Sequence, residues 1–216
     1  MHLQPDFRSG QFALAIFYGG MVCIAGVLGN KQVALGPLAV EGGIFAFLLL
    51  VVISSAFSEL YGQALANMLV RIGFVPLLAS IALSSLVMAL PPSPEMDPER
   101  KNAFVLMMGA TPRIWIAGII AYGVSQTLNV TIFSAMKRGE GGWLWLRSAV
   151  AGILSQIADT LLFIGIAFYG IFPIGQLLLG QMMAKVVLSV LLVPLLVALT
   201  VKIGRKLDAR SNSASI

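Results

Sequence analysis

Ionisable residues inside apolar segments are the first sign of chemistry in this sequence. Asp159 and Lys185 each interrupt a long apolar run. An ionisable side chain at the middle of a bilayer costs roughly 3 kcal/mol on insertion scales, so it marks a functional site by default. Asp159 lies twelve residues past Arg147, which is about 18 Å along a helix, and Lys185 reaches a similar depth in its own segment. The pattern favours a ligand site, and a purely structural Asp159–Lys185 pair is the alternative.

A short internal repeat adds polar side chains near Asp159. Residues 125–133 (SQTLNVTIF) recur thirty positions later as residues 155–163 (SQIADTLLF). In each copy the Gln, the Asn or Asp, and the Phe are spaced i, i+3, i+7 and share one helical face. Consecutive membrane helices run antiparallel, so the two faces should meet near mid-depth. This predicts a site made by Gln126, Asn129, Phe133, Gln156, Asp159 and Phe163.

The chemistry of these side chains suits a flat, polar ligand. A carboxylate can accept two adjacent N–H groups, as on the edge of a guanine-like base, and carboxamides both donate and accept. Aromatic rings stack on flat heterocycles. Amides or small cations would fit the same groups, and interhelical hydrogen bonds worth about 0.6 kcal/mol each are the structural alternative.

The composition shows which elements must position these residues. The chain has 216 residues, of which 58% are hydrophobic and 11% charged, and its mean hydropathy is +0.94. Soluble domains carry about 25% charged residues. The chain therefore belongs in a bilayer, which excludes a soluble enzyme and a nucleic-acid-binding module. Cys23 is the single cysteine and has no disulfide partner in the chain.

Six apolar stretches are long enough to span a bilayer as helices, which needs about 20 residues each. We expect an all-α bundle of one domain over residues 12–203, with tails at 1–11 and 204–216. The last span is overlong and carries Pro194, so it should either be kinked or extend into the cytoplasm. Residues 91–101 should be a loop in water, and Asp208–Ile216 should be disordered. The expected spans are Phe12–Leu28, Pro37–Phe57, Met68–Leu90, Ile114–Met136, Ala149–Ile171 and Ile174–Ile203.

Basic residues at the segment ends predict the orientation. Cytoplasmic loops carry an excess of Lys and Arg, and a cytoplasmic N-terminus places nine such residues inside and four outside. Both termini should therefore be cytoplasmic, as an even number of spans requires. The inner group is Arg8, Arg71, Lys137, Arg138, Arg147, Lys202, Arg205, Lys206 and Arg210, and the outer group is Lys31, Arg100, Lys101 and Arg113.

Two further charged residues lie near span ends. Glu59 stands in the string SSAFSELYG (54–62) near the inner end of the second span, where it either belongs to the site or reaches the interface. Arg113 begins the fourth span, where position alone favours an interfacial anchor.

Several strings in fixed order resemble the queuosine precursor transporter family, also called the vitamin uptake transporter family. They cover roughly residues 25 to 200. The strings are SSAFSELYG (54–62), GATPRI (109–114), AYGVSQTLNV (121–130), WLWLR (143–147), LSQIADT (154–160) and IAFYG (166–170).

The resemblance implies a six-helix inner-membrane protein that imports 7-deazaguanine bases, such as 7-cyano-7-deazaguanine and 7-aminomethyl-7-deazaguanine, for queuosine modification of tRNA. It implies no cofactor, no enzyme activity and no nucleic-acid binding. Asp159 would hold the N–H edge of the base and Lys185 would keep Asp159 ionised. The remaining assignments are hydrogen bonds from Gln126, Asn129 and Gln156, stacking on Tyr122, Phe133 and Phe163, gating or orienting by Arg113 and Arg147, and a site role for Glu59.

This chain departs from the family pattern at two positions. Asn129 and Ser55 stand where the family often has Asp. A site with fewer carboxylates suits the neutral nitrile better than the cationic aminomethyl base, and another flat ligand is the alternative.

Three other readings are a capture subunit, an intramembrane enzyme and a channel. The chain lacks a Gly-x-x-x-x-Gly-Lys-Ser/Thr string, so a capture subunit would need a separate ATPase. Small residues on the first span (Ala15, Gly19, Gly20 and Gly26) would suit packing of such a partner, of a homodimer, or within the bundle. An intramembrane enzyme lacks its parts, because His2 is the one histidine. For a channel, the sequence shows no ring of carboxylates and no carbonyl filter.

Overall fold

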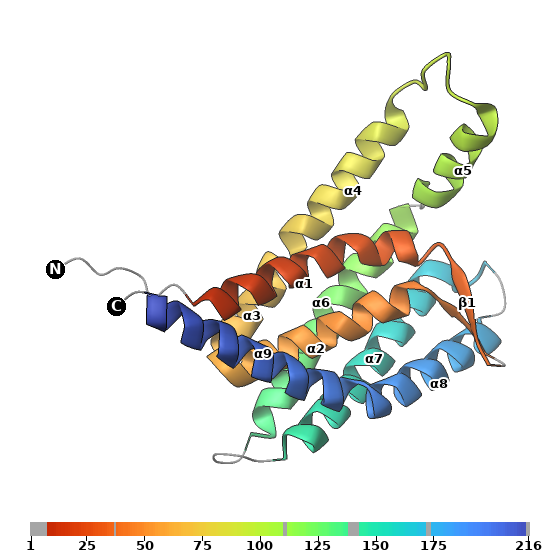
Figure 1. Cartoon of the computed structure of the whole chain (residues 1–216). Coiled ribbons are helices and arrows are strands. Elements are labelled where there is room, and N and C mark those ends of the chain that lie inside the picture. The colour runs from red at the N-terminus through yellow and green to blue at the C-terminus, as the bar shows by residue number, and fades with distance from the viewer. Residues whose placement is uncertain (1–7, 37, 110–111, 138–142, 172–173, 215–216) are drawn as a thin grey trace.

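The computed structural model describes residues 8–36, 38–109, 112–137, 143–171 and 174–214. It is a helical bundle (Figure 1). Five segments are long and apolar enough to cross a membrane. They are α1 (Ser9–Leu28), α2 (Gly43–Tyr61), the segment Gln63–Ala89 with α3 (Gln63–Ile72) and α4 (Phe74–Ala89), α6 (Pro112–Ala135) and α7 (Leu144–Phe168).

The last span is broken in the way that Pro194 predicts. Helices α8 (Gly175–Leu191) and α9 (Val193–Ala214) meet at an angle of 47°. Pro194 lies in the first turn of α9, where its missing N–H removes no helical hydrogen bond. Counted as one span, the bent pair completes the six expected spans, and the all-α membrane class is confirmed.

The C-terminal segment is ordered where a disordered tail was expected. Helix α9 continues to Ala214, so the prediction of disorder from Asp208 was wrong for residues 208–214. The Asp208 carboxylate accepts hydrogen bonds from the Gly10 amide (2.8 Å) and the Tyr61 hydroxyl (2.9 Å). The amides of a first helical turn lack partners within their own helix, and Asp208 satisfies one of them in α1.

A β-hairpin replaces the expected start of the second span. Strands β1 (Gln32–Leu35) and β2 (Leu38–Glu41) pair antiparallel, and α2 begins only at Gly43. Gly36 in the turn has a φ of +60°, which a glycine adopts at little cost. The apolar run after Pro37 suits a strand as well as a helix, because periodicity does not separate the two in short runs.

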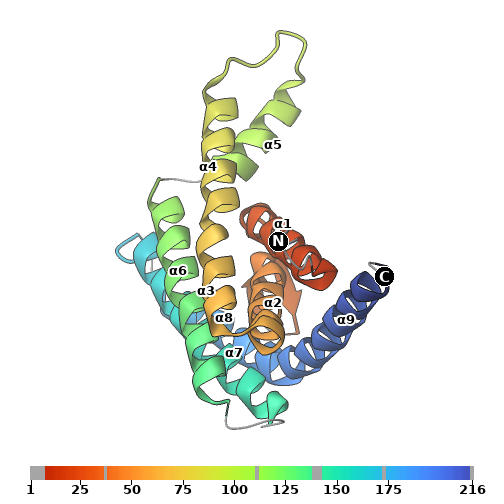
Figure 2. The same cartoon turned by 90° about the vertical axis from the view of Figure 1, so that its left-hand side faces the viewer.

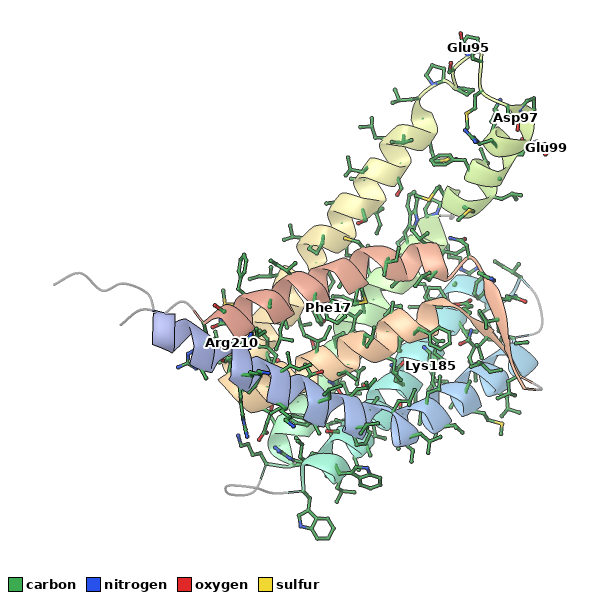
Figure 3. The ribbon with its side chains drawn as sticks, viewed as in Figure 1. Phe17, Glu95, Asp97, Glu99, Lys185 and Arg210 are labelled. Atoms are coloured by element: carbon green, nitrogen blue, oxygen red, sulfur yellow. The ribbon has the colours of Figure 1, made fainter. Side chains whose placement is uncertain are left out.

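A further helix, α5 (Pro98–Met108), begins within residues 91–101, which were expected to form a loop. The loop prediction was therefore wrong for residues 98–101. Asp97 precedes it and Pro98 takes its first position, a common way to begin a helix. In both views α4 and α5 project beyond the rest of the bundle (Figures 1 and 2). Figure 3 shows Glu95 and Glu99 at the tip of this projection, far from Lys185 inside the bundle.

The centre of the bundle is α2. Its apolar window is 72% buried, whereas that of the α3–α4 segment is only 6% buried. Helices α1, α6 and α9 pack around α2, and α7 packs along both α6 and α8 (Figure 1). This arrangement leaves one end of α2, next to the hairpin, beside an internal space.

Candidate functional site

A cavity of about 390 Å³ lies at the hairpin end of the bundle. Its walls come from α1, β2, α2, α4, α5, α6, α7 and α8. The wall combines an ion pair, aromatic rings and neutral polar groups. The charged, polar and aromatic residues of the wall include Asn30, Glu41, Phe47, Ser80, Ser84, Trp115, Tyr122, Asp159, Phe163, Phe168, Gln181 and Lys185.

The ion pair in the wall joins α7 to α8. Lys185 Nζ lies 2.6 Å from Asp159 Oδ2, and both side chains are less than 10% exposed. The Ser125 hydroxyl lies 3.4 Å from Asp159 Oδ1, and Lys185 Nζ lies 5.7 Å from the centre of the Phe47 ring. The equal depth that the sequence predicted for Asp159 and Lys185 is therefore realised as direct contact beside open space.

Two of the predicted aromatic residues also line this cavity. Tyr122 comes from α6 and Phe163 from α7, and Trp115 stands two turns before Tyr122 on α6. The Tyr122 hydroxyl lies 2.9 Å from the Val70 carbonyl, to which it donates. Aromatic faces and a carboxylate therefore border the same space.

The other predicted polar residues of α6 point elsewhere. Asn129 donates to the hydroxyls of Ser54 (2.9 Å) and Ser55 (3.0 Å) on α2. The Ser54 hydroxyl donates to Gln126 Oε1 at 3.2 Å. The polar stripe of α6 therefore faces α2, and Ser125 is its link to Asp159.

Below the cavity lies a layer of buried polar groups. Gln156 precedes Asp159 by three residues on α7, and Ser189 follows Lys185 by four on α8. Because α7 and α8 are consecutive, both lie about one turn, roughly 5 Å, beyond the ion pair. Among the described residues, the side-chain amide atoms of Gln156, the Ser189 hydroxyl and Asn129 Oδ1 have no hydrogen-bond partner.

A second ion pair closes the opposite end of the bundle. Arg147 Nη2 lies 2.8 Å from Glu59 Oε2, and Lys137 Nζ lies 3.8 Å from the same oxygen. The Arg147 guanidinium carbon lies 4.6 Å above the centre of the Phe133 ring. Glu59, Arg147 and Phe133 thus form a cluster of their own, and the exposed face that stacking on Phe133 would need is covered.

Arg113 lies at the cavity end of the bundle. Its guanidinium donates to the carbonyls of Ile166 and Tyr169, the latter at 2.8 Å, at the end of α7. A cation near the last carbonyls of a helix stabilises the helix. The position fits orientation of backbone carbonyls, the second of the two roles expected for Arg113.

Sequence reasoning missed Glu41, which lines the cavity at the end of β2. Burial raises the pKa of Glu41, while nearby Lys185 lowers it and Asp159 raises it. The signal was available, because Glu41 is a carboxylate inside a stretch that was expected to span the membrane. Gln181 was missed too, although it precedes Lys185 by one turn on the same face of α8.

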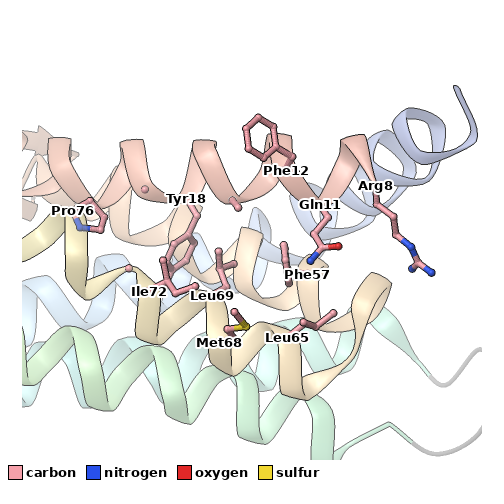
Figure 4. A pocket seen from close by; sticks show the side chains of 13 residues that line it. Arg8, Gln11, Phe12, Tyr18, Phe57, Leu65, Met68, Leu69, Ile72 and Pro76 are labelled. Atoms are coloured by element: carbon pink, nitrogen blue, oxygen red, sulfur yellow. The ribbon is translucent and has the colours of Figure 1, made fainter. Parts of the chain in front are cut away.

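A second pocket, of about 410 Å³, lies between α1 and α3 (Figure 4). Its wall is largely apolar, with rings and aliphatic chains of Phe12, Tyr18, Phe57 and Leu69. Among its described lining residues, Arg8 is the one ionisable group besides Tyr18, and none is a carboxylate. The described groups for hydrogen-bonding a base are therefore gathered in the other cavity.

Comparisons with known proteins agree with this architecture. A family model described as "Putative vitamin uptake transporter" matches residues 41–199. The chain is 29% identical over 167 residues to the "Probable queuosine precursor transporter" of Bacillus subtilis (strain 168), which covers 76% of this chain and 72% of that protein. No solved structure matches. With its multiple membrane-spanning helices, the chain belongs to the vitamin uptake, or queuosine precursor, transporter family, a family of transporters and not of enzymes.

Proposed function

We propose that this protein imports queuosine precursors, 7-deazaguanine bases such as 7-cyano-7-deazaguanine and 7-aminomethyl-7-deazaguanine, across the bacterial inner membrane. The observation that carries the proposal is the cavity beside Asp159. It brings a buried carboxylate and aromatic rings to one space, and the related Bacillus subtilis protein is named for the same transport.

The base would bind by its edge and its faces. A 7-deazaguanine presents a ring N–H and an exocyclic NH₂ side by side, which a carboxylate accepts in pairs. Asp159 offers these acceptors, with Lys185 Nζ 2.6 Å from its Oδ2. Tyr122, Phe163 and Trp115 supply ring faces for stacking. The cavity of about 390 Å³ lies in the range of about 300–1,000 Å³ typical of small-molecule sites.

The two ion pairs support a path for the base through the bundle. With the N-terminus cytoplasmic, the cavity lies toward the outer end of the bundle and the Glu59–Arg147 pair lies at the cytoplasmic end. Transport by alternating access requires the first end to close and the second to open around the site. The side-chain amide atoms of Gln156, the Ser189 hydroxyl and Asn129 Oδ1 have no hydrogen-bond partner among the described residues. They provide hydrogen-bonding positions between the two ends.

The deciding experiment measures queuosine in tRNA. A host that lacks queuosine biosynthesis and its own importer is supplied with a trace of either base, with and without this protein. Queuosine that appears only with the protein supports import. Its absence, with the protein in the membrane, would mean either that an energising partner is missing from the host or that the substrate is a different flat molecule.

A reconstituted measurement separates a solitary carrier from a subunit that needs an ATPase. Proteoliposomes containing only this purified chain should accumulate labelled base. If cells import the base but the proteoliposomes do not, an energising partner is required, and copurification should recover it.

A further inference from the structure

Glu41 is held beside the ion pair by the packing of the hairpin on α8. Val40, Ile44 and Ala184 form one buried apolar cluster. Glu41 follows Val40 and Lys185 follows Ala184 in the sequence, and both side chains line the cavity together with Asp159. Three charged residues from β2, α7 and α8 therefore face one space.

Their charges do not balance. Lys185 is in contact with Asp159 at 2.6 Å, and among the described residues none of the ion pairs includes Glu41. The described cavity wall thus holds two carboxylates and one ammonium group. Attraction between opposite charges is stronger in a low-dielectric interior than in water, so the extra carboxylate favours a cationic ligand.

The aromatic residues of the wall favour the same ligand. Phe47, Trp115, Tyr122, Phe163 and Phe168 surround the space, and the face of an aromatic ring attracts a cation. The other carboxylate of the bundle interior, Glu59, is not available for this role. It lies at the opposite end and is neutralised by Arg147 at 2.8 Å.

We propose that Glu41 binds a positively charged substituent of the substrate, so that the protein prefers bases carrying a primary ammonium group over their uncharged counterparts. This inference rests on the proposed function. Asp159 takes the ring edge and Glu41 takes the substituent. Of the two bases, 7-aminomethyl-7-deazaguanine carries a primary amine that is protonated at neutral pH like that of lysine. The preference is therefore the reverse of the one expected from Asn129 and Ser55.

The test compares the two labelled bases in cells expressing Glu41→Gln, with protein in the membrane quantified. We expect the half-saturating concentration of the aminomethyl base to rise at least tenfold, and that of the nitrile base to change by less than about threefold. Glu95→Gln is the matched control, because Glu95 is exposed at the tip beyond α4. Equal effects on both bases, or no effect on either, would overturn the proposal.

A second measurement needs only the wild-type protein. Unlabelled aminomethyl base should inhibit uptake of labelled nitrile base at lower concentrations than unlabelled nitrile base does. Equal or weaker inhibition would overturn the preference even if Glu41→Gln fails to fold. Failure of the proposed function looks different, because the wild type would then import neither base.

Discussion

Two ion pairs buried in the described part of the bundle have the same chemistry and different surroundings. Helix α7 supplies a member of each, Arg147 and Asp159, which are about 18 Å apart along the helix. The Asp159–Lys185 pair borders a cavity with aromatic walls, and Glu41 adds a further carboxylate there. The Glu59–Arg147 pair is covered by Phe133 and approached by Lys137. The ion pair alone therefore does not distinguish the two ends of the bundle, whereas the open space beside Asp159–Lys185 does.

The largest effect should come from Asp159→Asn. The amide keeps the size of the side chain but removes its charge, and it leaves Lys185 buried without its partner. We expect uptake of both bases to fall at least a hundredfold while the protein remains in the membrane. Uptake of labelled base at matched protein abundance measures the effect. Asp97→Asn, on the exposed projection, is the control, and normal import by Asp159→Asn would rule out the assigned base contact.

Arg147→Gln should lower the stability of the folded protein more than it lowers uptake of the bases. Loss of one partner from a buried ion pair costs about 3–5 kcal/mol. Lys137 at 3.8 Å still accompanies Glu59, so we expect the lower part of that range. Thermal unfolding in detergent should show a clear fall in Tm.

The double variant Glu59→Gln/Arg147→Gln provides the control for this pair. It removes both charges, so its Tm should lie above that of Arg147→Gln alone. If the fall in Tm of the double variant equals the sum of the falls for the two single substitutions, the ion pair does not stabilise the closed end. The proposed difference in role between the two ion pairs would then be wrong.

Acidification should weaken import of the aminomethyl base. Burial raises the pKa of Glu41 above its ordinary value of 4.5, so Glu41 takes up a proton at a higher pH than an exposed glutamate. Uptake should be full above this pKa and fall as the pH falls through it. The other titratable groups facing the cavity are Asp159, Lys185, Tyr122 and Cys23.

The nitrile base and Glu41→Gln separate Glu41 from those groups. Import of the uncharged nitrile base should fall less over the same pH range. In the Glu41→Gln variant, import of the two bases should depend on pH in the same way. A parallel fall for both bases in the wild type would instead assign the pH dependence to groups other than Glu41 or to the driving force.

The smallest effect should come from Tyr122→Phe. The substitution keeps the ring at the cavity wall and removes the hydroxyl that donates to Val70 (2.9 Å) and lies 3.1 Å from the Tyr18 hydroxyl. A buried hydrogen bond contributes about 1 kcal/mol, with a further cost for the carbonyl left without its donor. We expect a small fall in Tm and nearly unchanged uptake. A large loss of uptake would mean that the hydroxyl itself contacts the base.

The sequence was most informative where helix geometry fixes the answer. The rise per residue placed Asp159 and Lys185 at one depth. In the structure the two side chains form an ion pair. Helix geometry did not predict which side of α6 faces the cavity, because that depends on which helices pack against α6. In the structure Asn129 faces Ser54 and Ser55 on α2 instead of the cavity. Glu41 was missed because its apolar neighbours suited a spanning helix, while pairing with β1 made them a strand.

The contact of Asp208 with Gly10 and Tyr61 has a consequence for how the protein is made. It joins the first turn of α1 to a residue 198 positions later. Gly10 lies on α1, Tyr61 on α2 and Asp208 on α9. A side chain on Gly10 would collide with Asp208 and the Gly204 carbonyl, so these three helices meet closely there. During synthesis, α1 is made long before α9, so its Gly10 amide can gain this acceptor only once residue 208 has been added to the chain. A chain truncated before Asp208 would therefore lack this connection between α1, α2 and α9.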